Sequence, residues 1–206
     1  MFTLAEANGV RVVRVPSDEF VYSLPRLHTW VGALDHAMGV AAARESADVI
    51  HAHDWMVGRG GRRASDALGV PLVATIHATE AGRHRGWLPD AVSAGVHLVE
   101  QWLVDEADEV IVCSSAMADE VHRGHRRADS VVIPNGIDVT AYQRTTQIPA
   151  ELATGSPRLL FVGRLEWEKG VFVAVDAMPA VLREHPHARL RIVGTGGQAA
   201  AVAALV

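Results

Sequence analysis

The sequence predicts an α/β protein of two domains, each built on a doubly wound parallel sheet. Short runs rich in Val and Ile alternate along the chain with longer segments of helical periodicity. Repeated strand–helix–strand units are typical of parallel sheets, whose neighbouring strands are joined by crossover helices. Most of the runs are apolar without strict alternation, which favours strands that are covered on both faces.

The expected elements follow from this alternation. The expected strands lie at residues 10–15, 48–53, 71–77, 109–114, 130–134, 158–163 and 189–194. The expected helices lie at residues 29–45, 58–68, 91–106, 115–125 and 171–184. Within residues 91–106, Val92, Val96, Val99 and Leu103 recur at steps of three and four, which is the stripe of a helix packed on a core.

Residues 138–157 separate the two expected domains, because this stretch is polar and broken by Pro and Gly. We therefore expect a first domain at residues 1–138, a linker at 139–156 and a second domain at 157–206. Both domains are expected to be incomplete at the chain ends. The first residues are interpreted as the end of a helix with a glycine stop, and the last as a helix cut short. A complete but minimal protein is the alternative.

Composition narrows the classes of function. With 19 basic and 24 acidic residues and no Lys/Arg block, the chain is not expected to bind nucleic acid. It has no secretory signal and no apolar run of about eighteen residues that could span a bilayer. The single cysteine, Cys113, lies in the apolar run EVIVCSS without a cationic neighbour, which predicts a buried, inert thiol. A lone cysteine also fits a reducing cytoplasm.

The stretch LLFVGRLEWEKG, which ends at Gly170, predicts a phosphate site. Arg164 and Lys169 follow a strand at the carboxyl edge of a parallel sheet, where ligands of open α/β folds bind. A guanidinium, an ammonium and the start of the next helix together suit a diphosphate. Gly163 and Gly170 would let the backbone approach it closely. The alternative is a solvated loop with internal Glu–Lys pairs.

Histidines form the second candidate cluster. In HAHD, His51 and His53 project from the same face of a strand, which by itself is compatible with a metal site. A metallo-hydrolase of the H-x-H-x-D-H type would need Asp and His where Trp55 and Met56 stand, so no metal is expected. His77 ends an apolar strand, where a histidine is often only a hydrogen-bonded residue at the edge of the core.

The segment GRLEWEKG resembles the G-R-L-x-x-x-K-G signature of glycosyltransferases with the GT-B fold, in the broad family that includes bacterial and archaeal glycogen synthases. This resemblance implies two Rossmann-like domains and a nucleotide sugar as donor. It also implies that Arg164 and Lys169 grip the diphosphate and stabilise it as the leaving group, in place of a metal ion. No cofactor is expected.

Further segments are similar to the same family in order and spacing: VIHAHDW at 49–55, VATIHA at 73–78, EADEVIVCSS at 106–115 and VIPNGID at 132–138. The resemblance implies that the acceptor-side residues are His53, Asp54 and Trp55, with core packing the alternative for Trp55. It implies that His77 faces the donor sugar and the charge developing at its anomeric carbon, without acting as a proton shuttle. Gly194 and Gly196 would form a turn near the nucleotide, although a purely structural turn explains them equally well.

The resemblance therefore implies a retaining hexosyltransferase that moves glucose from UDP- or ADP-glucose to an α-1,4-glucan. Ala78 stands where the best-known bacterial glycogen synthases carry an asparagine, which fits the shorter actinobacterial and archaeal-like enzymes. One alternative is another GT-B transferase, such as a lipid mannosyltransferase. Another is an inactive carbohydrate- or nucleotide-binding remnant, because two glutamates separated by seven residues, which retaining members carry, are absent. This chain alone is expected to be incomplete and inactive.

Overall fold

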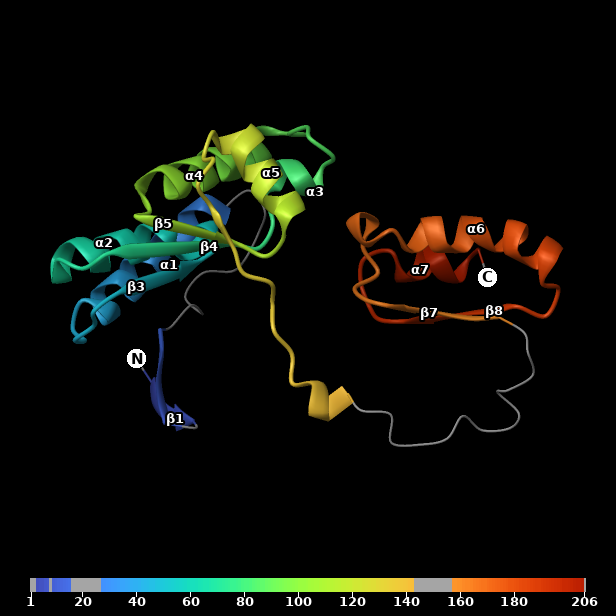
Figure 1. The fold of residues 1–206 in the computed structure, drawn as a ribbon, viewed down its shortest axis with the longest axis horizontal. Helices are drawn as coiled ribbons and strands as arrows, with labels where there is room; N and C mark the ends of the chain where they lie inside the picture. The colour runs from blue at the N-terminus through green and yellow to red at the C-terminus, as the bar shows by residue number, and fades with distance from the viewer. Residues whose placement is uncertain (1–2, 8, 16–26, 143–156, 206) are drawn as a thin grey trace. The chain divides into compact units, whose positions relative to one another are not determined.

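The computed structural model describes residues 3–7, 9–15, 27–142 and 157–205. The chain divides into two compact units, residues 1–136 and residues 137–206. Figure 1 draws both units and labels their elements. Among the described residues, no helix is long and apolar enough to cross a membrane.

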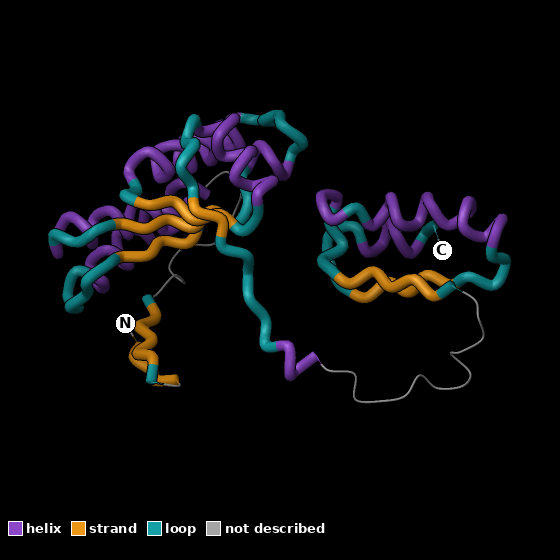
Figure 2. Tube along the Cα trace, viewed as in Figure 1, coloured by secondary structure: helices purple, strands orange, loops and turns teal. Residues whose placement is uncertain are grey.

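The first unit is built on a parallel sheet with the strand order β3-β4-β5-β6. Its strands are β3 (Ile50–His53), β4 (Leu72–Ile76), β5 (Glu109–Val112) and β6 (Val131–Val132). Three helices connect them in turn: α2 (Gly58–Leu68), α4 (Ala91–Glu106) and α5 (Ser115–His125). The α/β class and the parallel pairing are confirmed, and these three helices have the expected bounds. Figure 2 distinguishes the strands from the helices by colour.

Alternate residues of the strands form the main core together with α4 and α5. This core contains Ala52, Leu72, Ala74, Ile76, Leu103, Val104, Ala107, Val110, Val112 and Val121. On β3 the alternate residues His51 and His53 are exposed, whereas Thr75 of β4 is buried. The periodic stripe on α4 is buried at Val96, Val99 and Leu103, as its spacing predicts.

Helix α1 (Leu27–Ala42) packs closely on α2 because glycines stand at the contact. A Cβ atom at Gly60 would lie 2.7 Å from the carbonyl oxygen of Asp35, and one at Gly39 would lie 3.1 Å from the carbonyl oxygen of Gly60. The Gly60 N–H donates to the Asp35 carboxylate at 2.9 Å. Burial raises the pKa of Asp35, because the surrounding protein disfavours its charged form.

The N-terminal segment differs from the expectation. Strands β1 (Thr3–Ala7) and β2 (Val10–Arg14) form an antiparallel hairpin, so these residues neither end a helix nor contribute a parallel strand. Gly9 in the connection has a φ of 76°, which glycine adopts without steric cost. The Asn-Gly dipeptide before Val10 is a strong hairpin signal, which the helical interpretation overlooked.

The second unit contains a two-stranded parallel sheet of β7 (Arg158–Val162) and β8 (Arg189–Val193). Helices α6 (Val171–Glu184) and α7 (Ala199–Ala203) lie on the same side of it (Figure 1). Leu165, Val171 and Val202 form its small core. Of the expected linker, residues 139–142 belong to a short 3-10 helix, η3 (Val139–Tyr142), and residues 143–156 lie outside the described part of the chain.

A core substitution tests the packing of α4 on the sheet. Leu103 is fully buried, so Leu103→Ala should lower the free energy of unfolding by about 2–5 kcal/mol through lost contacts and a cavity. Leu98 lies on the same helix but is 63% exposed, and Leu98→Ala should change it by less than about 0.5 kcal/mol. Urea denaturation monitored by circular dichroism measures both values, and equal effects would contradict this packing.

Candidate functional site

The carboxyl edge of the first sheet gathers three side chains from three strands. Asp54 follows β3, His77 follows β4 and Cys113 follows β5. In a parallel sheet the residues just beyond neighbouring strands meet at one edge, where open α/β folds bind their ligands. The register pairs His53 with Thr75 and Thr75 with Ile111, which brings these strand ends level.

His77 is held by hydrogen bonds on both ring nitrogens. Its Nε2 lies 3.0 Å from Nδ1 of His53, and the two rings stack at 5.3 Å between centroids. Its Nδ1 lies 3.3 Å from the Cys113 sulfur, which also lies 3.6 Å from Oδ1 of Asn135. A ring held from two sides has a defined position. That His77 faces a donor sugar stays a prediction.

Asp54 is a strained residue that joins the ends of β3 and β4. Its Oδ1 accepts from the backbone N–H of His77 at 2.8 Å, and its own N–H donates to the Thr75 carbonyl at 2.9 Å. Its backbone has a φ of 63° and a ψ of 173°, a combination found essentially only for glycine. Such strain costs about 1–3 kcal/mol and concentrates at functional sites. The structure thus fixes the carboxylate of a predicted acceptor residue.

His51 lies beside this group on β3. Its Nε2 lies 2.7 Å from the Thr75 hydroxyl, and its ring centroid is 4.3 Å from that of His53. Desolvation lowers the pKa of His51 because burial disfavours its charged form, and the neighbouring rings of His53 and His77 lower it further by electrostatic repulsion.

The structure shows how two further side chains at this edge lie, and only Cys113 differs from the expectation for it. Trp55 is only 6% exposed and packs with Leu27, Val31, Val96 and Val99, which is the core-packing alternative. Cys113 was expected to be buried and inert, but it is half-buried and contacts His77. The expectation failed because Cys113 lies just past the end of β5, at the same edge as the histidines.

The segment after His77 is anchored to the helices behind it. Thr79 caps α3 (Glu80–Arg83) by accepting from the Gly82 N–H at 2.9 Å, and its hydroxyl donates to the Glu120 carboxylate of α5. Glu80 accepts from the Ser93 hydroxyl at 2.7 Å. Hydrogen bonds to α4 and α5 therefore position the residues that follow the candidate site.

In the second unit, Arg164 and Lys169 lie in the loop between β7 and α6. Arg164 forms an ion pair with Glu168 at 3.0 Å, and 68% of its side chain is exposed. Lys169 ends the short 3-10 helix η5 (Trp167–Lys169), is exposed and makes no ion pair within the described part of the chain. No side chain caps the N-terminus of α6, so its first N–H groups are available to an anion.

The glycines of this loop region differ in whether, and for what structural reason, glycine is required. A Cβ atom at Gly194 or Gly196 would collide with the carbonyl oxygen of Gly163 or Leu165, so both glycines are needed for loop packing. Gly170 is the N-cap residue just before α6 and has a φ of 72°, so its conformation rather than lack of space favours glycine. At Gly163 a Cβ would make only ordinary contacts, the nearest at 3.7 Å with Phe161.

Comparison with known families identifies the class of the protein. Residues 3–141 match Glycosyltransferase Family 4, and residues 143–205 match Glycosyl transferases group 1. The chain belongs to Glycosyltransferase Family 4. It is 43% identical over 203 residues to the glycogen synthase of Mycobacterium tuberculosis, which is 92% of this chain and 48% of that protein. Similarity extends to the alpha-maltose-1-phosphate synthase of Mycolicibacterium smegmatis, with 37% identity over 65% of this chain and 37% of that protein.

Solved structures share the GT-B fold, as the resemblance predicted. The sucrose-phosphate synthase of Thermosynechococcus elongatus matches with a TM-score of 0.74 and 21% identity, over 93% of this chain and 48% of that one. The catalytic domain of starch synthase IV from Arabidopsis thaliana, bound to ADP and acarbose, matches with a TM-score of 0.61 and 17% identity. This match covers 95% of this chain and 54% of that one. The chain thus spans about half the length of the relatives it matches.

Sequence reasoning missed several residues of the site. Cys113 contacts His77, Thr75 contacts His51 and Asn135 contacts Cys113, although no role was expected for any of these three residues. The signal for Cys113 was its place directly after a predicted strand, the same argument that singled out His77. Asn135 and Thr75 gave no local signal, because their contacts cross between strands.

The strain at Asp54 predicts different outcomes for two substitutions. Both Asp54→Gly and Asp54→Ala remove the carboxylate, but only glycine adopts the backbone conformation freely. The glycine variant should be more stable to unfolding by about 1 kcal/mol, since relief of strain exceeds the extra chain entropy of glycine. Chemical denaturation measures the difference, and a more stable alanine variant would show that the residue is unstrained.

The histidine cluster predicts a coupled titration. In the folded chain His51 should titrate below 6.5, so stability should fall as the pH drops below 6.5, where the unfolded chain binds this proton more readily than the folded chain. His53→Gln removes one repelling ring and should raise the pKa of His51. NMR titration of the imidazole signals measures both effects. His122→Gln, a substitution at an exposed position of α5, is the control and should leave the pKa of His51 unchanged.

Proposed function

We propose that the protein acts as a retaining glucosyltransferase, moving glucose from UDP- or ADP-glucose to an α-1,4-glucan. The observation that carries this proposal is the loop between β7 and the uncapped start of α6, with Arg164 and Lys169 as its exposed cations. The 43% identity to a glycogen synthase over 92% of the chain supports the choice of reaction.

The diphosphate is the group whose charge grows as the sugar–phosphate bond breaks. A planar guanidinium can donate two parallel hydrogen bonds to phosphate oxygens, and an ammonium adds a mobile point charge. The first N–H groups of α6 add donors and the positive end of the helix dipole. These groups stabilise the departing diphosphate, so no metal ion is needed for the transfer in this proposal.

Glu168 competes for Arg164 before the donor binds. Their ion pair at 3.0 Å is mostly exposed and therefore weak, so a diphosphate with two negative charges displaces the carboxylate readily. The pair holds the guanidinium near its working position without a large energetic cost. Arg164 is thus partly ordered before binding.

The first unit supplies the acceptor side and the sugar contact in this proposal. Both ring nitrogens and the N–H of His77 already have partners, so in this proposal its backbone carbonyl is the group that faces the sugar. His53 and the Asp54 carboxylate offer acceptors to sugar hydroxyls. Trp55 is buried and contributes only packing.

A sugar phosphate is the second candidate acceptor. The 37% identity to an alpha-maltose-1-phosphate synthase favours it, because that relative is named for a sugar phosphate product. Incubation of the full-length protein with nucleotide glucose and either glycogen or glucose 1-phosphate separates the two acceptors. Elongated glucan supports the first candidate, and a phosphorylated disaccharide supports the second. We also propose that the reaction takes place in the cytoplasm, where nucleotide sugars are made.

Arg164 and Lys169 form the proposed diphosphate clamp, and this assignment predicts a specific loss of affinity. Arg164→Ala in the full-length protein should weaken binding of the nucleoside diphosphate about 10- to 100-fold, the value of one or two charge-assisted hydrogen bonds. Isothermal titration calorimetry with UDP and ADP measures it. Arg183→Ala, at the other end of α6, is the matched control and should bind normally. Unchanged affinity in Arg164→Ala would refute the clamp.

A further inference from the structure

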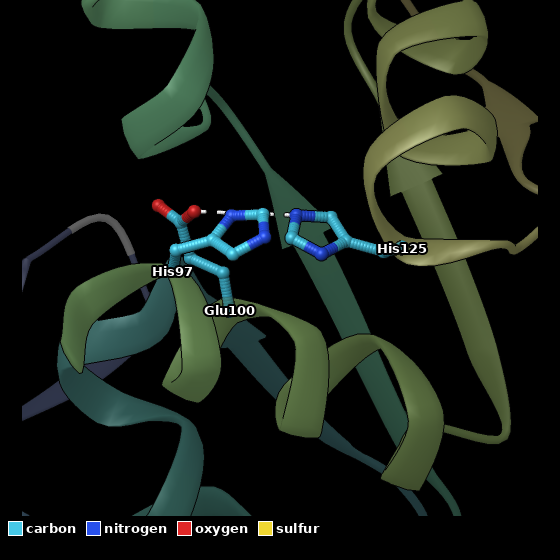
Figure 3. Close-up of side chains that lie close together, drawn as sticks. All are labelled: His97, Glu100 and His125. Carbon is cyan, nitrogen blue, oxygen red and sulfur yellow. Dashed lines mark ion pairs between the residues drawn. The ribbon is translucent and has the colours of Figure 1, made fainter. Parts of the chain in front are cut away.

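A buried polar cluster joins α4 and α5. His97 and Glu100 lie three residues apart on α4, hence on one face of it, and His125 is the last residue of α5. One nitrogen of each imidazole and one carboxylate oxygen all lie within 4.8 Å of one another. Figure 3 shows the three side chains, from two helices, gathered together.

The cluster contains buried nitrogens without a hydrogen-bond partner. Nδ1 of His97 and both ring nitrogens of His125 have no partner among the described residues. His125 is 2% exposed and Glu100 is 1% exposed. An unpaired buried polar atom costs about 1–3 kcal/mol, so a ligand that pairs with one nitrogen of each ring would remove part of this cost.

The polar and charged groups around the cluster leave its histidine nitrogens without hydrogen-bond partners. Both Glu100 oxygens accept from the Glu80 N–H, at 3.0 and 2.9 Å, and Arg83 lies 3.9 Å from Oε1. Oε2 faces His125 Nε2 at 4.0 Å, which is too long for a hydrogen bond. An imidazole nitrogen without a hydrogen-bond partner can offer its lone pair to a metal ion.

We propose that His97, Glu100 and His125 bind a divalent transition metal ion, for which zinc is the best chemical match. Two imidazoles and a carboxylate form an established ligand set for zinc, and a water molecule completes four-coordination. The ion would satisfy one nitrogen of each ring and neutralise the Glu100 carboxylate.

The geometry requires only small side-chain movements. Tetrahedral zinc with bonds of about 2.0–2.1 Å holds its ligand atoms about 3.3 Å apart, so donors now within 4.8 Å need to close by about 1.5 Å at most. The Glu80 N–H already donates to both oxygens of the Glu100 carboxylate and orients it, as hydrogen-bond partners of metal ligands do. His97 is half-buried, whereas Glu100 and His125 are buried.

Such an ion would tie three elements together. Glu100 and His97 belong to α4 and His125 to α5, while Glu80 begins α3, the short helix that follows His77. Metal binding would therefore fix the helices behind the sheet edge. This role is structural and separate from the proposed transfer chemistry, which uses no metal ion.

Zinc titration of the 206-residue chain, freed of metal with a chelator, tests the proposal. Calorimetry should find one tight equivalent, and thermal unfolding should occur at higher temperature with zinc. His97→Gln and His125→Gln should each weaken binding at least about 100-fold and abolish the thermal shift, because each removes one of three ligands. Cobalt(II) in place of zinc should give d–d absorption that both variants lose.

His122→Gln is the matched control, since His122 lies on α5 but is exposed. It should bind zinc and cobalt like the unaltered chain. Circular dichroism of the metal-free variants checks the fold, and half-buried His97 carries the test if the change at buried His125 prevents folding. Absence of tight binding overturns the proposal. So does binding that survives His97→Gln but is lost in His77→Gln, which would assign the ion to the sheet edge.

Discussion

The parallel register of β3, β4 and β5 is the constraint on which the candidate site of the first unit depends. It brings the residue that follows each strand to the same edge, so Asp54, His77 and Cys113 meet although they are far apart in sequence. Hydrogen bonds then fix what the register has brought together. The Asp54 carboxylate holds the His77 backbone, and His53 and Cys113 hold its ring.

Close packing of two loops plays the same part in the second unit. The chain after β8 lies against the chain after β7, with Gly194 and Gly196 placed where any side chain would strike a carbonyl oxygen. The Leu165 N–H donates to the Thr195 carbonyl at 2.8 Å, and the Gln198 N–H donates to the Leu165 carbonyl at 2.9 Å. These contacts fix the backbone beside Arg164 while its side chain stays in solvent.

The helix behind the sheet edge combines two environments. Val96, Val99 and Leu103 of α4 pack into apolar cores, but Glu100 and His97 bring polar groups to the junction with α5. Burial raises the pKa of Glu100 to about 7, because desolvation outweighs its hydrogen bond from Glu80 and the nearby Arg83.

The sequence by itself determined the elements and the class of the protein. Apolar runs and helical periodicity located the parallel strands and the bounds of α2, α4, α5 and α6, because those signals depend on neighbours a few residues apart. Strand ends marked His77, and a local motif marked Arg164. Only the tertiary structure decided that Trp55 is buried, that Cys113 contacts His77, and that His125 joins the two polar residues of α4. Each of these depends on contacts between segments far apart in the chain, where a residue's type says nothing of its partner.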